Sequence, residues 1–442
     1  MHLPRRVRAA VVATATAMLA LALPSSASAT TLGDGGLPIV NAAGSTLLVV
    51  AHRGGAFQWP ENSLEAFTGS AEAGYDGIET DLAWTSDAQP VMSHNDELPD
   101  RCTSAGKKIH QLTAAQVAEV RCANLTGDKV VPIPTFAQLA NVLADHPDIA
   151  LHLDLKSYTG QSSAGKRTYA TRAMALLKKY GLLGRTRILT FFWSSMLPVI
   201  RKASRSIFVT AYDGASFDLD LARVRLADRL GADAYAPRMI HTSAYLARYV
   251  RSKGLNVAPF EVSGAEQLAF TIHYGGKTQF LLSDEPAILQ RSLIDGTTAI
   301  DPVAVPTTTT LPKAVKVSSG TYKGGAAHYP RVLGKAVPTA DRPMLDTVTV
   351  AVTVSRGRGL GTLRVGPRSA SYGSVSVGLP KGTKTLTLKV PLGNNGDLRI
   401  STTRSAKLTV RVVGYTRVRF PGSSVIGTNV VGKHAPVVLA GA

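Results

Sequence analysis

The chain has 442 residues, room for about two or three domains, and 45% of them are hydrophobic. This composition excludes a largely disordered protein and is ordinary for a chain that builds a sizeable core. The net charge of +19 is not ordinary, and it is unevenly placed. Residues 301–442 hold 20 Lys and Arg against 4 Asp and Glu, a net charge of +16. The C-terminal third is therefore expected to seek an anionic surface.

Residues 1–29 have the pattern of a signal peptide. Three arginines precede an apolar run that ends near Leu23, and Ala27-Ser28-Ala29 supplies a small-residue cleavage site. The run is shorter than the roughly 20 residues that cross a membrane, and no other segment is long enough to span. We therefore expect a secreted or cell-wall-associated protein whose mature chain starts near Thr30. A membrane anchor is the alternative interpretation.

The mature chain is expected to begin with a polar leader over 30–45 and to continue with a repeated strand and helix pattern over 46–295. The leader is rich in small residues, whereas short apolar runs then alternate with amphipathic segments. Strands are expected at 47–52, 77–82, 149–155, 187–192, 206–211, 232–236, 256–261 and 279–283. Helices are expected at 61–73, 136–144, 167–180, 195–203, 218–230, 243–253 and 265–274. Eight strands over about 245 residues favour an α/β fold of the (β/α)8 TIM-barrel type. A doubly wound open sheet is the alternative.

The C-terminal region has a different pattern. Residues 296–318 are rich in Thr and Pro and are expected to form a semi-extended linker. Over 319–442 apolar and polar residues alternate with period two, which indicates a small antiparallel β-sandwich with Lys and Arg outward. We expect this basic domain to bind an anionic cell-wall polymer or a membrane surface, with a charged spacer as the alternative. Nucleic acid is not expected, because the region lacks an aromatic stacking platform.

Cys102 and Cys122 are the two cysteines of the chain. If the protein is exported to an oxidising compartment, we expect them to form a disulfide. Two free buried thiols are the alternative.

Acidic residues cluster at the ends of the expected strands. Glu79 and Asp81 are two residues apart and so point to the same face of a strand, and Asp154 ends the next strand. Three carboxylates are all-oxygen ligands, which suit Ca²⁺ or Mg²⁺ rather than zinc. The sequence therefore predicts a divalent metal site, against the alternative of a solvated carboxylate pair.

Basic residues lie beside the same strand ends. His52 and His94 suit a general acid/base pair, because imidazole titrates near neutrality. Arg53 and Lys156 suit the binding of a substrate phosphate. The alternatives are hydrogen-bonded structural histidines and salt bridges at the barrel rim.

These residues fall in an ordered set of motifs that resembles the glycerophosphodiester phosphodiesterase family over about residues 46–293. The motifs are Val50-Ala51-His52-Arg53-Gly54, Pro60-Glu61-Asn62-Ser63, Gly77-Ile78-Glu79-Thr80-Asp81, His94, Asp100-Arg101, Leu153-Asp154-Leu155-Lys156 and Leu282-Ser283-Asp284-Glu285-Pro286. The resemblance implies a TIM-barrel enzyme that depends on a divalent cation and splits glycerophosphodiesters into glycerol 3-phosphate and an alcohol. It implies His52 and His94 as the catalytic pair. It implies Glu79, Asp81 and Asp154 as metal ligands, and Arg53 and Lys156 as phosphate-binding residues.

The chain departs from the family pattern at a few positions. Asp154 stands where the family usually has Glu, Asn95 where it usually has Asp, and Phe260-Glu261 where a Trp is frequent. We expect the chemistry to be retained and the substrate pocket to differ. The loop between Cys102 and Cys122 resembles that of secreted sphingomyelinase D and phospholipase D enzymes, so a phospholipid substrate is the enzymatic alternative. A non-catalytic surface-binding protein is the alternative outside enzymes.

Overall fold

The structure is a computed structural model, and part of the chain is described. The described residues are 39–40, 46–124, 127, 129–214, 221–262, 265–275, 278–287, 289–290, 298–299, 303–341, 344–367, 373–392, 396–421, 424–425 and 438–441. The predicted signal peptide (1–29) lies outside them, as does most of the predicted leader. None of the described helices is long and apolar enough to cross a membrane.

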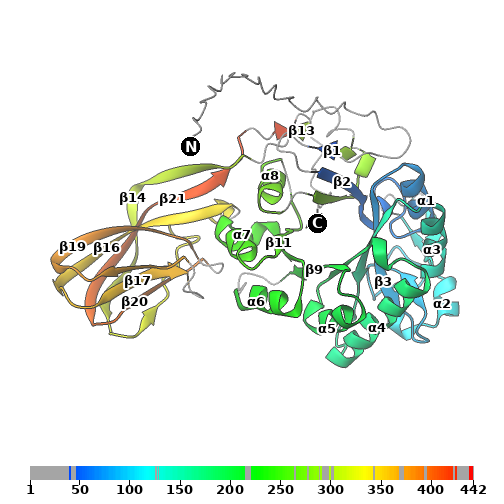
Figure 1. The fold of residues 1–442 in the computed structure, drawn as a ribbon, viewed down its shortest axis with the longest axis horizontal. Helices are drawn as coiled ribbons and strands as arrows, with labels where there is room; N and C mark the ends of the chain where they lie inside the picture. The colour runs from blue at the N-terminus through cyan, green and yellow to red at the C-terminus, as the bar shows by residue number, and fades with distance from the viewer. Residues whose placement is uncertain are drawn as a thin grey trace, which may run out of the picture. The chain divides into compact units, whose positions relative to one another are not determined.

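Eight parallel strands form the central sheet (Figure 1). They are β2 (Thr46–Ala51), β3 (Gly77–Trp84), β7 (Ala150–Leu155), β8 (Thr186–Thr190), β9 (Phe208–Asp213), β10 (Ala234–Pro237), β11 (Asn256–Val257) and β12 (Thr278–Ser283). Each pairs with its neighbour in this order from β2 to β11, and the last strand, β12, pairs with the first, β2, in register from Thr278 opposite Thr46 to Ser283 opposite Ala51. In the described part of the chain no ladder joins β11 to β12.

Side chains inside the sheet show that it curves into a barrel. Val50, Leu189, Tyr212 and Phe280, from strands spread around the sheet, belong to one buried apolar cluster. The Phe280 ring of β12 lies 4.9 Å from the His152 ring of β7. Strands that are three places apart in the sheet thus meet in the interior, as in a (β/α)8 barrel and unlike an open doubly wound sheet.

Helices connect consecutive strands and surround the barrel (Figure 1). They are α1 (Leu64–Glu72), α2 (Ala114–Ala118), α3 (Phe136–Asp145), α4 (Ser163–Lys179), α5 (Trp193–Ala203), α6 (Leu221–Leu230), α7 (Ala244–Arg251) and α8 (Ala265–Tyr274). Several begin at a Ser or Thr whose side-chain oxygen accepts a backbone N–H, as Ser63 does from Ala66 and Thr135 from Gln138. Their apolar faces pack on the outside of the strands in the largest buried cluster of the described chain.

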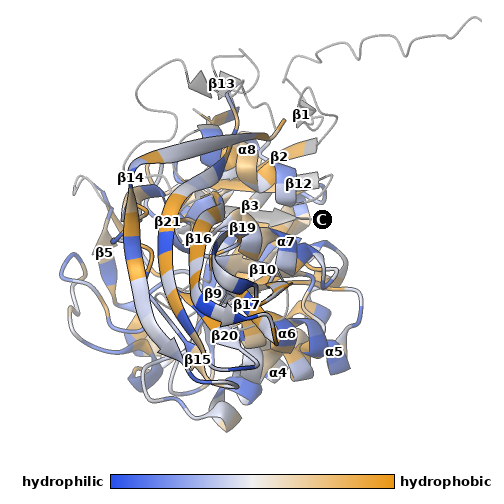
Figure 2. Cartoon of the chain, turned by 90° about the vertical axis from the view of Figure 1, so that its left-hand side faces the viewer, coloured by the Kyte–Doolittle hydropathy of each residue, from blue (hydrophilic) through white to orange (hydrophobic). Residues whose placement is uncertain are grey.

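Two four-stranded antiparallel sheets follow the barrel. The first has the order β14 (Val305–Tyr322), β21 (Ala406–Arg419), β16 (Leu345–Arg358), β19 (Lys381–Val390). The second has the order β15 (Ala327–His328), β20 (Leu398–Thr402), β17 (Thr362–Pro367), β18 (Val375–Gly378). Hydropathy alternates along β16 and β21, as Figure 2 shows, and the buried residues of both sheets share one core. This is the predicted β-sandwich.

The prediction of a linker over 296–318 is wrong for residues 305–318. These residues lie in β14, which pairs with β21 from Val305 opposite Arg419 to Tyr322 opposite Ala406. Thr is β-branched and fits a strand well, and β14 is an edge strand, where proline is tolerated. The register shifts between Thr310 and Val315, around Leu311-Pro312. The Thr/Pro composition therefore marks an edge strand here.

The remaining short strands are β1 (Ile39–Val40), β4 (Pro90–Met92), β5 (Arg121–Ala123), β6 (Val130–Pro132), β13 (Thr298–Ala299), β22 (Ser424–Val425) and β23 (Val438–Gly441). β4 pairs antiparallel with β3, and β5 with β6. Met344, Val418 and Phe420 belong to the same buried cluster as the barrel helices, and Phe420 meets Phe270 of α8 edge to face.

Candidate active site

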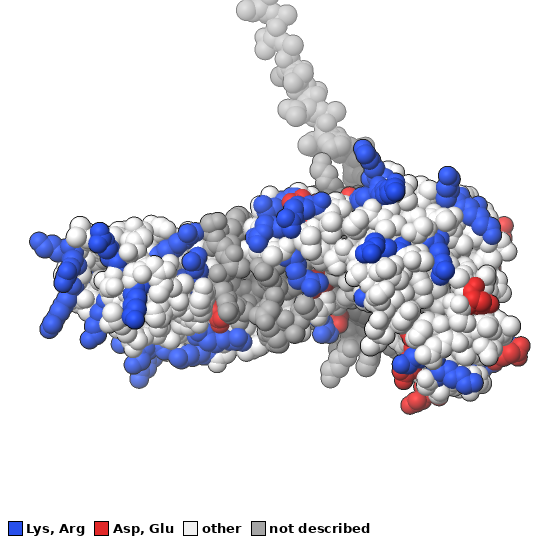
Figure 3. Space-filling view, turned by 90° about the horizontal axis from the view of Figure 1, so that it is seen from below, with Lys and Arg blue, Asp and Glu red and all other residues white. Residues whose placement is uncertain are grey.

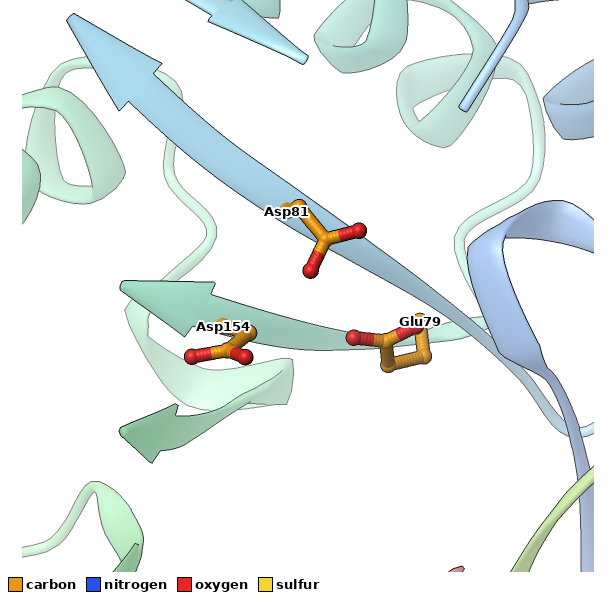
Figure 4. Close-up of side chains that lie close together, drawn as sticks. All are labelled: Glu79, Asp81 and Asp154. Atoms are coloured by element: carbon orange, nitrogen blue, oxygen red, sulfur yellow. The ribbon is translucent and has the colours of Figure 1, made fainter. Parts of the chain in front are cut away.

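Three buried carboxylates lie side by side on β3 and β7 (Figure 4). Asp81 is opposite Asp154 in the parallel ladder, and Glu79 is two residues before Asp81 on the same face. One oxygen from each of the three lies within 4.8 Å of the others. β3 runs on to Trp84, where it pairs with β4, so Glu79 and Asp81 lie inside this strand and not at its end.

Asn62 fixes the orientation of Asp81. Its side-chain N–H donates to Asp81 Oδ2 at 2.7 Å, and its side-chain oxygen accepts from the Thr80 hydroxyl at 2.6 Å. Asn62 is buried and has φ of 53°, a left-handed conformation that Asn tolerates better than most residues. It follows Glu61, whose carboxylate accepts from Arg53 Nη1 at 2.9 Å and also binds Arg101.

Two cations face the carboxylates. Lys156 Nζ lies 2.9 Å from Asp81 Oδ1 and also binds Asp154. Arg53 donates its backbone N–H to Glu79 Oε2 at 2.9 Å, and its Nε lies 3.7 Å from Asp81 Oδ2. Among the described residues no acceptor lies within hydrogen-bond distance of this buried Nε atom, so its hydrogen-bonding capacity is not met.

His52 lies in the turn that follows β2, where its ring is held by a carboxylate from the last strand. Its Nδ1 lies 2.6 Å from Oδ1 of Asp284, which follows β12, and its Nε2 lies 3.8 Å from Glu79. Burial alone would lower the pKa of His52, but the hydrogen bond to Asp284 and the charge of Glu79 outweigh it and raise this pKa. Nδ1–H thus points to Asp284 and Nε2 to the carboxylate cluster.

His94 follows β4, and its environment has the opposite effect. Its Nδ1 lies 2.8 Å from the side-chain oxygen of Asn95. Burial lowers the pKa of His94 to about 4, because Lys156 and Arg53 add to the effect of burial and together outweigh Asp81. The two histidines therefore differ in proton affinity, which an acid/base pair requires.

The donor set fits a divalent cation. Burial and the neighbouring charge of Asp81 raise the pKa of Glu79, and burial raises that of Asp154. No described residue donates a hydrogen bond to the buried Oδ1 of Asp154. A cation held by one oxygen of each carboxylate would relieve the repulsion between Glu79 and Asp81 and would give Asp154 Oδ1 a partner. Ca²⁺ and Mg²⁺ are the ions that prefer ligands made only of oxygen.

The disulfide loop lies beside His94. Cys102 and Cys122 form a disulfide. Both cysteines line a cavity of about 40 Å³ that His94 and Asn62 also line. The loop thus borders the site on one side.

Aromatic rings from β9 and the segments after β8 and β11 form a second wall. Tyr212 lies 5.0 Å from Phe191 and 5.4 Å from Phe260 between ring centroids. Burial and the three site carboxylates raise the pKa of Tyr212 well above its usual value, which places this ring near the carboxylate cluster. Glu261 follows Phe260, and its carboxylate accepts hydrogen bonds from two nitrogens of Arg238. Phe260 is the ring at the position where the sequence departs from the family pattern.

Two residues of the site were not predicted from sequence, although both fall in the quoted motifs. Asn62 is within Pro60-Glu61-Asn62-Ser63, and Asp284 is within Leu282-Ser283-Asp284-Glu285-Pro286. The contacts that give them roles join segments far apart in the chain, so no local spacing indicates them.

Comparisons with known proteins agree with this geometry. The model of the glycerophosphoryl diester phosphodiesterase family matches residues 52–279. A glycerophosphodiester phosphodiesterase of Caldanaerobacter subterraneus is 25% identical over 249 residues, 55% of this chain and 96% of that protein. Mouse glycerophosphodiester phosphodiesterase 1 is 32% identical over 126 residues, 28% of this chain and 38% of that protein.

One solved structure shows the same fold. It is a glycerophosphoryl diester phosphodiesterase from Silicibacter pomeroyi, described as putative in its own name, with a TM-score of 0.50 and 22% identity over 60% of this chain and 97% of that one. The family match covers more than half of the chain and contains all the carboxylates and histidines described above apart from Asp284. The chain therefore belongs to the glycerophosphoryl diester phosphodiesterase family.

Proposed function

We propose that this protein hydrolyses glycerophosphodiesters to glycerol 3-phosphate and an alcohol, with a divalent cation and the histidines His52 and His94. The observation that carries the proposal is the meeting of three buried carboxylates and two histidines with opposite pKa shifts at one end of the barrel. Membership of the family supports the same reaction. The named activities of the two curated relatives support it as well.

The site residues have different roles, which follow from their positions. Glu79, Asp81 and Asp154 would hold the cation, which supplies Lewis-acid stabilisation of the phosphate charge when bound. The Arg53 guanidinium would bind a non-bridging phosphate oxygen, and Lys156 adds a second positive charge.

The histidines move the protons. One imidazole removes a proton from the nucleophile, and the other protonates the leaving oxygen. The nucleophile is either water or the neighbouring glycerol hydroxyl; the hydroxyl forms a cyclic phosphate, which water then opens to glycerol 3-phosphate. Asp284 keeps the Nδ1 proton of His52 in place, so that Nε2 faces the reacting phosphate.

The test is turnover of glycerophosphocholine with Ca²⁺ or Mg²⁺, followed by identification of the products. We expect glycerol 3-phosphate and choline, and loss of both in His52→Ala and His94→Ala proteins that melt like the wild type. Absence of turnover on soluble diesters and lipids with any divalent ion would reject the proposal. Turnover of lysophospholipid or sphingomyelin alone, with release of a cyclic phosphate, would support the sphingomyelinase D-like alternative.

We also propose that the protein is exported and attaches to an anionic surface, a cell-wall polymer or a membrane. The pattern of residues 1–29 supports export, and the net charge of +16 over 301–442 supports attachment. Fractionation of cells that express the full chain, followed by a salt wash of the envelope, tests both. Recovery of an uncleaved protein in the cytoplasm would contradict export.

A further inference from the structure

A cavity of about 370 Å³ opens at one end of the C-terminal sandwich, where three connections between strands meet. They join β16 to β17, β18 to β19 and β20 to β21, and each crosses from one sheet of the sandwich to the other. Four exposed cations line this cavity, which we call the basic pocket: Arg356, Arg358, Arg404 and Lys407.

In the described part of the chain no carboxylate neutralises the charge of the basic pocket. Among the described residues no Asp or Glu lines it, and none of its four cations is in an ion pair. Two of the acidic residues of this region pair with other cations: Asp341 binds Arg417, and Asp346 binds Arg248. On the face shown in Figure 3, Lys and Arg lie over both the C-terminal sheets and the barrel, whereas most of the Asp and Glu lie on the barrel. An anion is therefore the ligand that the pocket lacks.

Two glycines allow the connections around the basic pocket to pack closely, because a glycine has no Cβ atom. A Cβ atom on Gly357 would lie 2.0 Å from the carbonyl oxygen of Pro380, and one on Gly361 would lie 2.8 Å from Arg404 Cγ. The backbone N–H of Arg356, a residue with φ of 52°, donates to Thr383 at 3.1 Å. Close packing of these connections thus fixes the backbone from which the cations of the basic pocket project.

Leu360 adds an apolar element. It lies in the connection between β16 and β17, lines the basic pocket and is 65% exposed, the most exposed large hydrophobic side chain of the described residues. A soluble polyanion gives such a side chain nothing to contact. The interface of an anionic bilayer offers phosphate groups to the cations and acyl chains to the leucine.

We propose that the basic pocket and Leu360 dock the protein onto membranes that contain anionic phospholipids, with a lipid phosphate in the pocket and Leu360 in the headgroup and acyl-chain boundary. The anionic membrane is thus the partner in the surface attachment. The docking proposal depends on that attachment and not on the catalytic activity. A lipid surface is also where glycerophosphodiester groups are concentrated, so docking would hold the barrel near its substrates.

The experiment is co-sedimentation of the full-length mature protein with vesicles of phosphatidylcholine, with or without phosphatidylglycerol. The test variant is Arg356→Gln/Arg358→Gln/Arg404→Gln. The control variant is Arg167→Gln/Lys178→Gln/Lys202→Gln, which removes the same charge from exposed positions on the barrel helices. We expect affinity for the anionic vesicles to fall on the order of 100-fold in the test variant and by less than about fivefold in the control. Leu360→Ser should lower affinity about tenfold with no change in net charge.

Three outcomes would overturn the proposal. The first is wild-type binding by the test variant, and the second is an equal loss in the control variant, which would indicate a response to net charge alone. The third is binding of soluble poly(glycerol phosphate) as tightly as vesicles together with no effect of Leu360→Ser, which would indicate a cell-wall polymer instead. Turnover of glycerophosphocholine, measured on the same proteins, should be unchanged, so that a failure to bind is distinguished from a failure of the enzyme.

Discussion

His52 Nδ1 lies 2.6 Å from Asp284 Oδ1, although the two residues are 232 positions apart. The contact exists because β2 and β12 are adjacent in the barrel and each places a polar residue just after its last residue. The first and last strands thus close the sheet and orient one imidazole at the same place. A carboxylate in this position fixes the tautomer of the ring and favours its protonated form.

Asp284→Asn should lower kcat on the order of 100-fold with little change in thermal stability. The amide can still meet the ring, but it removes the charge that raises the pKa of His52. The limb of the pH–rate profile that belongs to His52 should therefore move to lower pH. Asp228→Asn, an exposed change on α6, is the control. A profile identical to that of the wild type would show that Asp284 has only a structural role.

Local pattern was sufficient to predict the repeating elements but not the contacts between them. The helix expected at 265–274 is α8 (Ala265–Tyr274), and the strand expected at 149–155 is β7 (Ala150–Leu155), because buried runs and amphipathic periods are short-range signals. Asp284 gains its role from a contact with His52, which joins the segments after the last and the first strands of the barrel. No short stretch of sequence contains both residues. Residues 305–318 were misjudged because Thr and Pro suit a linker and an edge strand equally well.

Glu79→Gln should make the protein more stable without metal and insensitive to metal. In the wild type, burial and the neighbouring Asp81 raise the pKa of Glu79, so its ionised form is unfavourable until a cation is bound. The glutamine side chain would keep an oxygen for the Arg53 N–H, which donates to Glu79 at 2.9 Å in the wild type.

Thermal melts with a chelator and with Ca²⁺ or Mg²⁺ measure both effects of Glu79→Gln. We expect a rise in Tm of about 2–4 °C in chelator, equivalent to roughly 1 kcal/mol, and loss of the rise that metal gives to the wild type. Activity should disappear in the variant and, after chelation, in the wild type. A variant that metal stabilises as much as the wild type would remove Glu79 from the ligand set.

Asp76→Asn should change how stability depends on pH. Asp76 accepts the backbone N–H of Val49 at 2.7 Å, and burial raises its pKa to about 6 from the ordinary 3.8. At a pH between these two values, Asp76 is ionised in the unfolded chain but keeps its proton in the folded chain. This carboxyl therefore makes the protein lose stability as pH rises from about 4 to about 6. The amide does not titrate, so the variant should lack this loss.

The measurement for Asp76→Asn is the free energy of unfolding in urea at several pH values between 4 and 7. The quantity of interest is the difference between variant and wild type, since other groups titrate equally in both. This difference should shift in favour of the variant as pH rises and level off above about pH 6. A difference that stays constant with pH would contradict the raised pKa.

Gly54→Ala should disturb the active site through backbone packing. Gly54 follows His52 and Arg53, has φ of 76°, and would carry its Cβ 2.7 Å from Ala66 Cβ and 3.1 Å from the Ala66 backbone of α1. Gly74 is a matched control, because its φ is 69° and a Cβ there would have no atom within 4 Å. Both changes incur the cost of a left-handed alanine, about 1–2 kcal/mol, but only Gly54→Ala must also push the His52 turn away from α1. We therefore expect Gly54→Ala to destabilise the protein more in urea and to lower kcat, and Gly74→Ala to retain full turnover. Equal losses in the two variants would mean that the close approach to α1 does not position His52.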